Sequence, residues 1–165
     1  MERVIDVAQF IFDEYKRQSG EVIDEMKLHK LLYLAQRENI AILGEPMFPE
    51  NFEGWRYGPV CREVRLCYTS DGMNAANLRE ISSESAYISK SIVLQYGAVE
   101  SWKLSQMSHN EISWVNARKG LSANTNGDRI LSLDDIRIDA GKVRPYDPIW
   151  DMYYDEFEDA EVAQE

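Results

Sequence analysis

The chain has 165 residues, of which 44% are hydrophobic and 28% are charged, and this composition is typical of one globular domain with a buried core. Its 18 Lys and Arg residues against 29 Asp and Glu residues give a net charge of −11. Non-specific nucleic-acid binding depends on basic residues that release counterions from phosphate, so the charge argues against that class of function.

The negative charge is concentrated at the C-terminal end. Residues 147–165 contain eight acidic residues and no basic one. The other 21 acids and the 18 bases give residues 1–146 a charge of only −3. We therefore expect a nearly neutral domain over 1–146 and an acidic appendage over 147–165, and an appendage of this kind favours a basic partner.

Cysteine usage and apolar patterning indicate a cytoplasmic protein. Cys61 and Cys67 form neither a CxxC pair nor a metal-ligand pattern, which suits a reducing compartment. The first residues carry acids within an amphipathic pattern rather than a basic start and an apolar run, and no stretch reaches the roughly 18 apolar residues of a membrane span. No cofactor or metal site is expected, and no membrane partner.

The first two elements are expected to be amphipathic helices. Apolar residues at three- and four-residue steps predict a helix over 4–18 that ends at Gly20. A second helix is predicted over 24–43, with Asp24 as N-cap and Gly44 as the stop. Because apolar residues cover most of its circumference, the second helix is expected at the centre of the fold.

The middle of the chain is expected to form an ordered loop followed by more helices. Residues 45–57 combine two prolines with four aromatic residues, a pattern typical of an extended loop packed on the core. Pro59 suits the first position of a helix, so a helix is predicted over 60–69. A further helix begins at Ser83 or Ser85 and ends at Tyr96, and a short one covers 101–106.

Two serines mark the starts of the last expected helices. Ser108 and Glu111 have the spacing of a capping box, which predicts one helix over 109–118. Ser132 is expected to cap a helix that contains Ile136. No alternation typical of strands extends for any length, so the predicted fold class is all-α: a compact, single-domain helical bundle.

The run Trp55-Arg56-Tyr57 is the most unusual feature of the domain. One interpretation is that the two aromatic side chains fill the core. The other is that they bind a partner, because aromatic residues and arginine dominate interface hot spots. Both interpretations stay open at this stage.

A second aromatic cluster lies in the acidic appendage. Trp150, Tyr153 and Phe157 occur at helical spacing among acidic residues. The stripe fits a terminal helix that docks on its own domain, and it also fits a segment that orders in the groove of a partner.

The two histidines offer little catalytic or metal-binding chemistry. His29 and His109 are 80 positions apart and neither has zinc-ligand spacing. His29 is expected to be a partly exposed helix residue. No nucleophile-elbow or phosphate-loop motif occurs, so an enzyme is not expected, although a small hydrolase or transferase using His109 remains the alternative of a different class.

Three blocks of sequence resemble a known domain in order and spacing. Residues 26–36 read MKLHKLLYLAQ, EPMF at 45–48 leads to WRYGPV at 55–60, and 104–118 read LSQMSHNEISWVNAR. Together they resemble the Panacea domain, also called the SocA-like domain, of prophage and bacterial antitoxins. The chain departs from the family pattern where EISW replaces a commoner acid-proline-Trp arrangement.

The resemblance implies an α-helical antitoxin that neutralises a cognate toxin by direct protein–protein contact. The toxin is expected to be encoded by a neighbouring gene and to act on translation or nucleotide metabolism. In one branch of the family the antitoxin is an adaptor that delivers its toxin to a protease. The expected partner-binding residues are the family-matched Trp55, Arg56, Tyr57, His109 and Trp114, together with Trp150, Tyr153 and Phe157 of the appendage.

Overall fold

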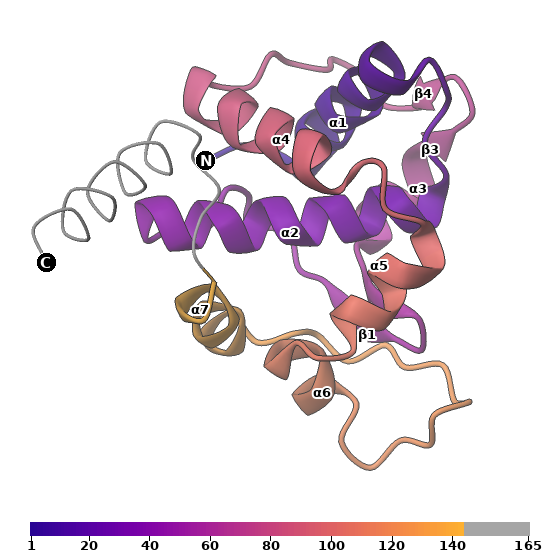
Figure 1. The fold of residues 1–165 in the computed structure, drawn as a ribbon, viewed down its shortest axis with the longest axis vertical. Helices are drawn as coiled ribbons and strands as arrows, with labels where there is room; N and C mark the ends of the chain where they lie inside the picture. Colours follow the sequence, from indigo (N-terminus) through magenta and orange to yellow (C-terminus); the bar gives the residue numbers. More distant parts are fainter. Residues whose placement is uncertain (144–165) are drawn as a thin grey trace, which may run out of the picture.

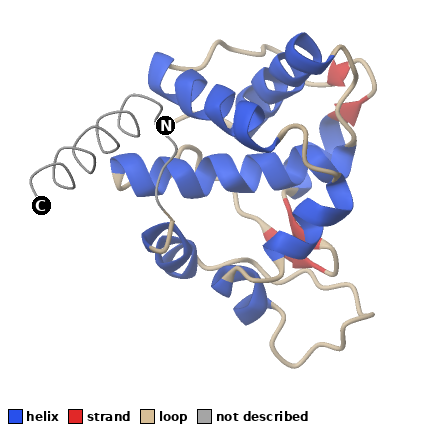
Figure 2. Cartoon of the chain, in the orientation of Figure 1, coloured by secondary structure: helices blue, strands red, loops and turns tan. Residues whose placement is uncertain are grey.

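The computed structural model describes residues 1–143, which form seven helices and two small antiparallel sheets (Figures 1 and 2). The helices are α1 (Val4–Ser19), α2 (Glu25–Leu43), α3 (Arg62–Cys67), α4 (Ser83–Tyr96), α5 (Ser101–Ser108), α6 (Ile112–Ala117) and α7 (Leu133–Gly141). The strands are β1 (Glu53–Trp55), β2 (Gly58–Val60), β3 (Tyr68–Thr69) and β4 (Gly72–Met73). The fold is therefore mostly helical and compact, as predicted, but it is not purely α-helical, because two small antiparallel sheets are present among the described residues.

Helix α2 runs through the centre of the molecule, as its hydrophobic circumference predicts. Helices α1 and α4 pack on one side of it, and α5 and α7 pack on the other (Figure 1). Its N-terminus is capped by Asp24, whose carboxylate accepts a hydrogen bond from the Lys27 backbone N–H (2.8 Å). Gly44 ends it in the left-handed conformation.

His29 is buried in α2, so the expectation of a partly exposed residue is wrong. Its side chain is 1% exposed, and its Nδ1 atom accepts a hydrogen bond from the Cys61 backbone N–H (3.2 Å). Burial lowers the pKa of His29 to about 3. The imidazole is therefore neutral and connects α2 to the chain just before α3.

The predicted helix over 60–69 is present only in part, as α3: Val60 ends strand β2, and Tyr68 and Thr69 form β3. The prediction that Pro59 begins the helix is wrong. Strand β1 pairs with β2, with Trp55 opposite Gly58, and α3 begins only at Arg62. The reason lies in two side chains of α2. Lys30 Nζ donates to the Pro59 carbonyl (3.0 Å), and His29 Nδ1 accepts a hydrogen bond from the Cys61 backbone N–H. These two side chains keep the backbone extended where Pro59 alone favours a helix start.

The predicted helix over 109–118 is present as α6, Ile112–Ala117, but it is shorter than expected and the predicted capping box is wrong. Helix α5 continues to Ser108, and α6 begins after Glu111 as N-cap. The Ser108 hydroxyl donates to the Ser105 carbonyl (2.6 Å), and the Glu111 carboxylate binds Arg37 of α2. Each member of the expected capping box therefore has another partner. The cap at Ser132 is confirmed, since its side chain accepts the Asp135 backbone N–H.

The appendage residues Trp150, Tyr153 and Phe157 lie outside the described residues. Within residues 1–143, no helix has the length and apolar character needed to cross a membrane.

Candidate partner-binding site

The β1–β2 hairpin presents Trp55, Arg56 and Tyr57 at and beside its turn. Tyr57 is 50% exposed, whereas Trp55 and Arg56 are half-buried. The Arg56 guanidinium lies over the Tyr57 ring, 4.4 Å from its centroid, a favourable cation–π geometry. The interpretation that both aromatic side chains fill the core is therefore wrong for Tyr57.

The backbone of the hairpin is held by side chains from several helices. Four side chains each donate a hydrogen bond to a backbone carbonyl between Gly54 and Pro59. The pairs are Lys30 to Pro59 (3.0 Å), Ser105 to Tyr57 (2.6 Å), Trp114 Nε1 to Trp55 (2.7 Å) and Arg118 to Gly54 (3.0 Å). Because these bonds use only backbone acceptors, they fix the hairpin and leave the side chains of its turn available to a partner.

His109 and Trp114 support the hairpin from the α5–α6 junction. Their rings stack in parallel, with centroids 4.1 Å apart and 8° between the planes. Burial lowers the pKa of His109 below its ordinary value, and the nearby cations Lys30 and Arg118 lower it as well. A hydrogen bond with the Arg56 backbone opposes this shift. The His109 Nε2 atom is buried and has no hydrogen-bond partner among the described residues.

Gly58 allows the hairpin to approach the helices closely. Its φ is +120°, and a Cβ atom there would lie 2.4 Å from Ser108 Oγ and 2.6 Å from Lys30 Cε. Any other residue would strain the backbone and displace both side chains. The glycine is thus required for the contact between β2 and the helices beneath it.

Arg62 and Arg65 of α3 extend the surface, and neither was identified from the sequence. Their guanidinium groups lie 5.9 Å and 5.0 Å from the centroid of the Trp55 ring. Arg62 also binds the Glu53 carboxylate through two hydrogen bonds (2.8 and 2.9 Å). We call Trp55, Arg56, Tyr57, Arg62 and Arg65 the hairpin face. The i, i+3 spacing of the two α3 arginines places them on one helix side, but only the fold places Trp55 beside them.

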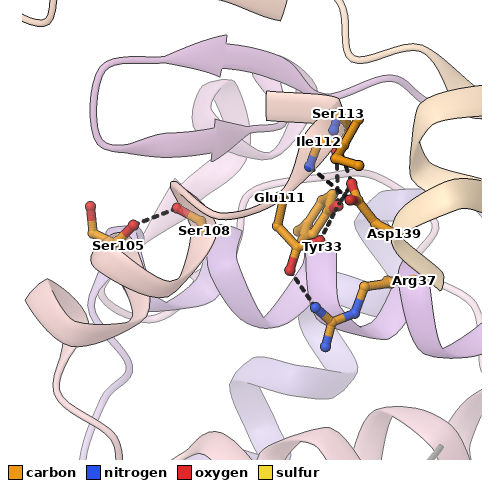
Figure 3. A network of polar contacts seen from close by, with 8 residues as sticks. All are labelled: Tyr33, Arg37, Ser105, Ser108, Glu111, Ile112, Ser113 and Asp139. Atoms are coloured by element: carbon orange, nitrogen blue, oxygen red, sulfur yellow. Dashed lines mark hydrogen bonds and ion pairs between the residues drawn. The ribbon is translucent and has the colours of Figure 1, made fainter. Parts of the chain in front are cut away.

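A buried polar network fixes α6 and α7 against α2 (Figure 3). The Tyr33 hydroxyl lies within hydrogen-bond distance of Ser113 Oγ (2.9 Å), Asp139 Oδ2 (3.0 Å) and Glu111 Oε2 (3.2 Å). Asp139 also accepts the backbone N–H groups that begin α6. Burial raises the pKa of Glu111, and Arg37 opposes that shift.

The network was missed by sequence analysis, although it positions Trp114 beneath the hairpin. A polar signal exists on α2, where Lys30, Tyr33 and Arg37 share one helix side. Glu111, the partner of both Tyr33 and Arg37, lies more than 70 positions further along the chain. No group of three or more His, Cys, Asp or Glu residues in the described part of the chain is arranged to hold a metal ion.

The five family-matched residues thus come together in one place, with three presented at the hairpin and two beneath it. A family model described as "Antitoxin SocA-like, Panacea domain" matches residues 28–115. This range is more than half of the chain and includes the hairpin, His109 and Trp114. No curated protein and no solved structure matches the chain. The chain belongs to the SocA-like, Panacea-domain antitoxin family.

Proposed function

We propose that the chain is an antitoxin that neutralises a cognate toxin by direct contact through the hairpin face. The family supports an antitoxin role in general. The observation that carries the proposed contact is the exposure of Tyr57, with Arg56 stacked on it, at the turn of a hairpin whose backbone is fixed by four side-chain donors. Aromatic and arginine side chains dominate interface energetics.

The rigidity of the hairpin supports the same role. Ordering of loops and side chains opposes association. Here the ordering is already supplied by the bonds from Lys30, Ser105, Trp114 and Arg118 to the hairpin carbonyls. A toxin that docks on Tyr57 therefore loses little affinity to ordering of the antitoxin.

Charge suggests which toxin surface fits. Arg62 and Arg65 of the hairpin face are paired with the carboxylates of Glu53 and Glu25, which leaves the Arg56 guanidinium beside Tyr57 as its main positive group. An acidic group on the toxin would complement Arg56. We propose a toxin that acts on translation or nucleotide metabolism.

Co-expression with the protein of the neighbouring gene tests this function. We expect that protein to arrest growth alone, to be harmless beside the antitoxin, and to co-purify with it at an undiminished level. A neighbour that is harmless alone would contradict the proposal. A toxin whose amount falls when the antitoxin is present would replace neutralisation with delivery to a protease.

A further inference from the structure

A pocket of about 210 Å³ lies between α2, α5 and the linker that joins α5 to α6. Its apolar wall consists of Leu34 of α2 with Leu104 and Met107 of α5. Its polar lining includes Arg37 and Glu111, which belong to the buried network described above. Small-molecule sites typically have volumes of roughly 300–1,000 Å³, so this smaller pocket has the size for one side chain of a partner.

The charges in and beside the pocket cancel. Arg37 pairs with Glu111, and the Tyr33 hydroxyl lies between Glu111 and Asp139 (Figure 3). Lys30 is a second cation when it is protonated, and burial lowers its pKa to about 7. The two carboxylates therefore balance the two cations, so no excess positive charge attracts an anion. An uncharged occupant suits this environment.

Arg37 brings a hydrogen-bond donor that has no acceptor. The residue is 7% exposed, and its Nε atom is buried without a hydrogen-bond partner among the described residues. A buried donor that lacks an acceptor destabilises the free protein, and a ligand that supplies the acceptor removes this penalty. Glu111 accepts hydrogen bonds from Tyr33 and Arg37, fewer than a carboxylate can take. The pocket thus offers one donor and one acceptor that are both incompletely used.

The pocket adjoins the hairpin face. Its exposed residues, Met107 and Asn110, flank His109 in the sequence, and His109 forms a hydrogen bond with the Arg56 backbone. Lys30 and Ser108 also line the pocket, and both lie against Gly58 of β2. A partner that covers the turn of the hairpin therefore lies next to the pocket.

We propose that the toxin inserts a carboxamide side chain, Asn or Gln, into this pocket. A carboxamide is uncharged and carries both an acceptor and a donor. Its oxygen accepts from Arg37 Nε, its nitrogen donates to Glu111, and its CH₂ groups lie against the apolar wall. The inference rests on the proposed function, because the occupant belongs to the toxin. It adds a second anchor, in a pocket that exists before binding, to the one at Tyr57.

NMR of the arginine Nε–Hε groups in the full chain, free and bound to the purified toxin, tests the inference. Arg37 reports the pocket, Arg62 reports the hairpin face, and Arg17 on α1 is the control. The Nε atoms of Arg62 and Arg17 already donate to Glu53 and Glu14. Each signal is assigned from its own Arg→Lys variant.

We expect the Arg37 proton to move downfield as it gains an acceptor, the Arg62 signal to shift, and the Arg17 signal to stay. In a complex with nitrogen-15-labelled toxin, a side-chain NH₂ group of the toxin should give nuclear Overhauser contacts to the Met107 methyl group. Contacts from an acidic or purely aliphatic side chain would overturn the assignment of a carboxamide. A shift of Arg62 without one of Arg37 would overturn the pocket inference and leave the hairpin face standing, whereas a complex in which neither moves would contradict both.

A blocked pocket gives an independent measurement. Met107→Trp fills the pocket from its exposed side, and Gln106→Trp places the same ring on an exposed position of α5 outside the pocket lining. We expect Met107→Trp to weaken toxin binding about tenfold or more, as for loss of an anchor residue, and Gln106→Trp to leave it nearly unchanged. Equal affinities of the two variants would overturn the inference, and the contribution of Tyr57 would still be measurable by itself.

Discussion

At the scale of single residues, the buried imidazole of His29 makes stability depend on pH. Its pKa is about 3 in the folded chain against an ordinary 6.5, so the unfolded chain binds the proton first. The stabilisation is complete above pH 6.5 and is lost as pH falls toward 3, by up to about 1.4 kcal/mol per pH unit. We expect His29 to account for about 2 kcal/mol of lost stability between pH 7 and pH 5.

Urea denaturation of the natural chain and of His29→Asn at both pH values measures this contribution. The variant is expected to be less stable at pH 7, because the Cys61 N–H loses its partner or gains a poorer one. It should nevertheless lose about 2 kcal/mol less than the natural chain on acidification. Parallel pH profiles would show that His29 is not the group responsible.

Gly58 is the residue whose size limits the contact between hairpin and helices. Gly58→Ala adds a Cβ atom 2.4 Å from Ser108 Oγ at a φ of +120°. Gly44→Ala is the matched control, because Gly44 also has a positive φ but nothing lies within 4 Å of its Cβ position. We expect a loss of about 1 kcal/mol for the control and of more than about 2 kcal/mol for Gly58→Ala. Equal losses in thermal denaturation would mean that the close contact is relieved without strain.

At the scale of elements, the hairpin depends on α6 for its position. Trp114→Phe keeps an aromatic ring against His109 but removes the donor to the Trp55 carbonyl. We expect a loss of about 0.5–1.5 kcal/mol and faster hydrogen exchange of the hairpin amides. Trp102→Phe is the control, since Trp102 is exposed on α5. Exchange rates that change equally in both variants would contradict the role of α6.

The elements that sequence analysis predicted correctly are those defined by local signals. Helices α1, α2 and α7 have their caps, stops and apolar spacing within their own segments. The hairpin and the break between α5 and α6 depend instead on distant partners: Lys30 for Pro59, His29 for Cys61 and Arg37 for Glu111. Local capping and proline preferences point elsewhere at both places, and tertiary contacts outweigh them.

The same distinction applies to the candidate site. The family blocks identified Trp55, Arg56, Tyr57, His109 and Trp114, which the fold brings together. They did not distinguish presented residues from supporting ones, because that depends on which surface α6 covers. The sequence did not identify Arg62 and Arg65 as part of the site, because their contact with Trp55 forms only when the hairpin packs against α3.

At the scale of the whole molecule, α2 links the core to the functional surface. Its apolar side chains pack against α1 and α4, while Lys30 holds the hairpin and Tyr33 and Arg37 hold α6. The hairpin face is thus held by a largely buried helix that runs through the centre of the molecule (Figure 1). A partner that binds there meets a surface that has little freedom to rearrange.

The most direct test of this account is the affinity of the toxin for Tyr57→Ala compared with Tyr87→Ala. The two tyrosines are 50% and 47% exposed, but Tyr87 lies on α4, away from the hairpin (Figure 1). Both variants should keep their stability within about 0.5 kcal/mol. Calorimetry with the purified toxin is expected to show binding weakened about 30-fold or more by Tyr57→Ala, the size of a hot-spot loss, and nearly unchanged by Tyr87→Ala. Unchanged affinity of Tyr57→Ala, or a larger loss for Tyr87→Ala, would contradict the hairpin face as the toxin-binding surface.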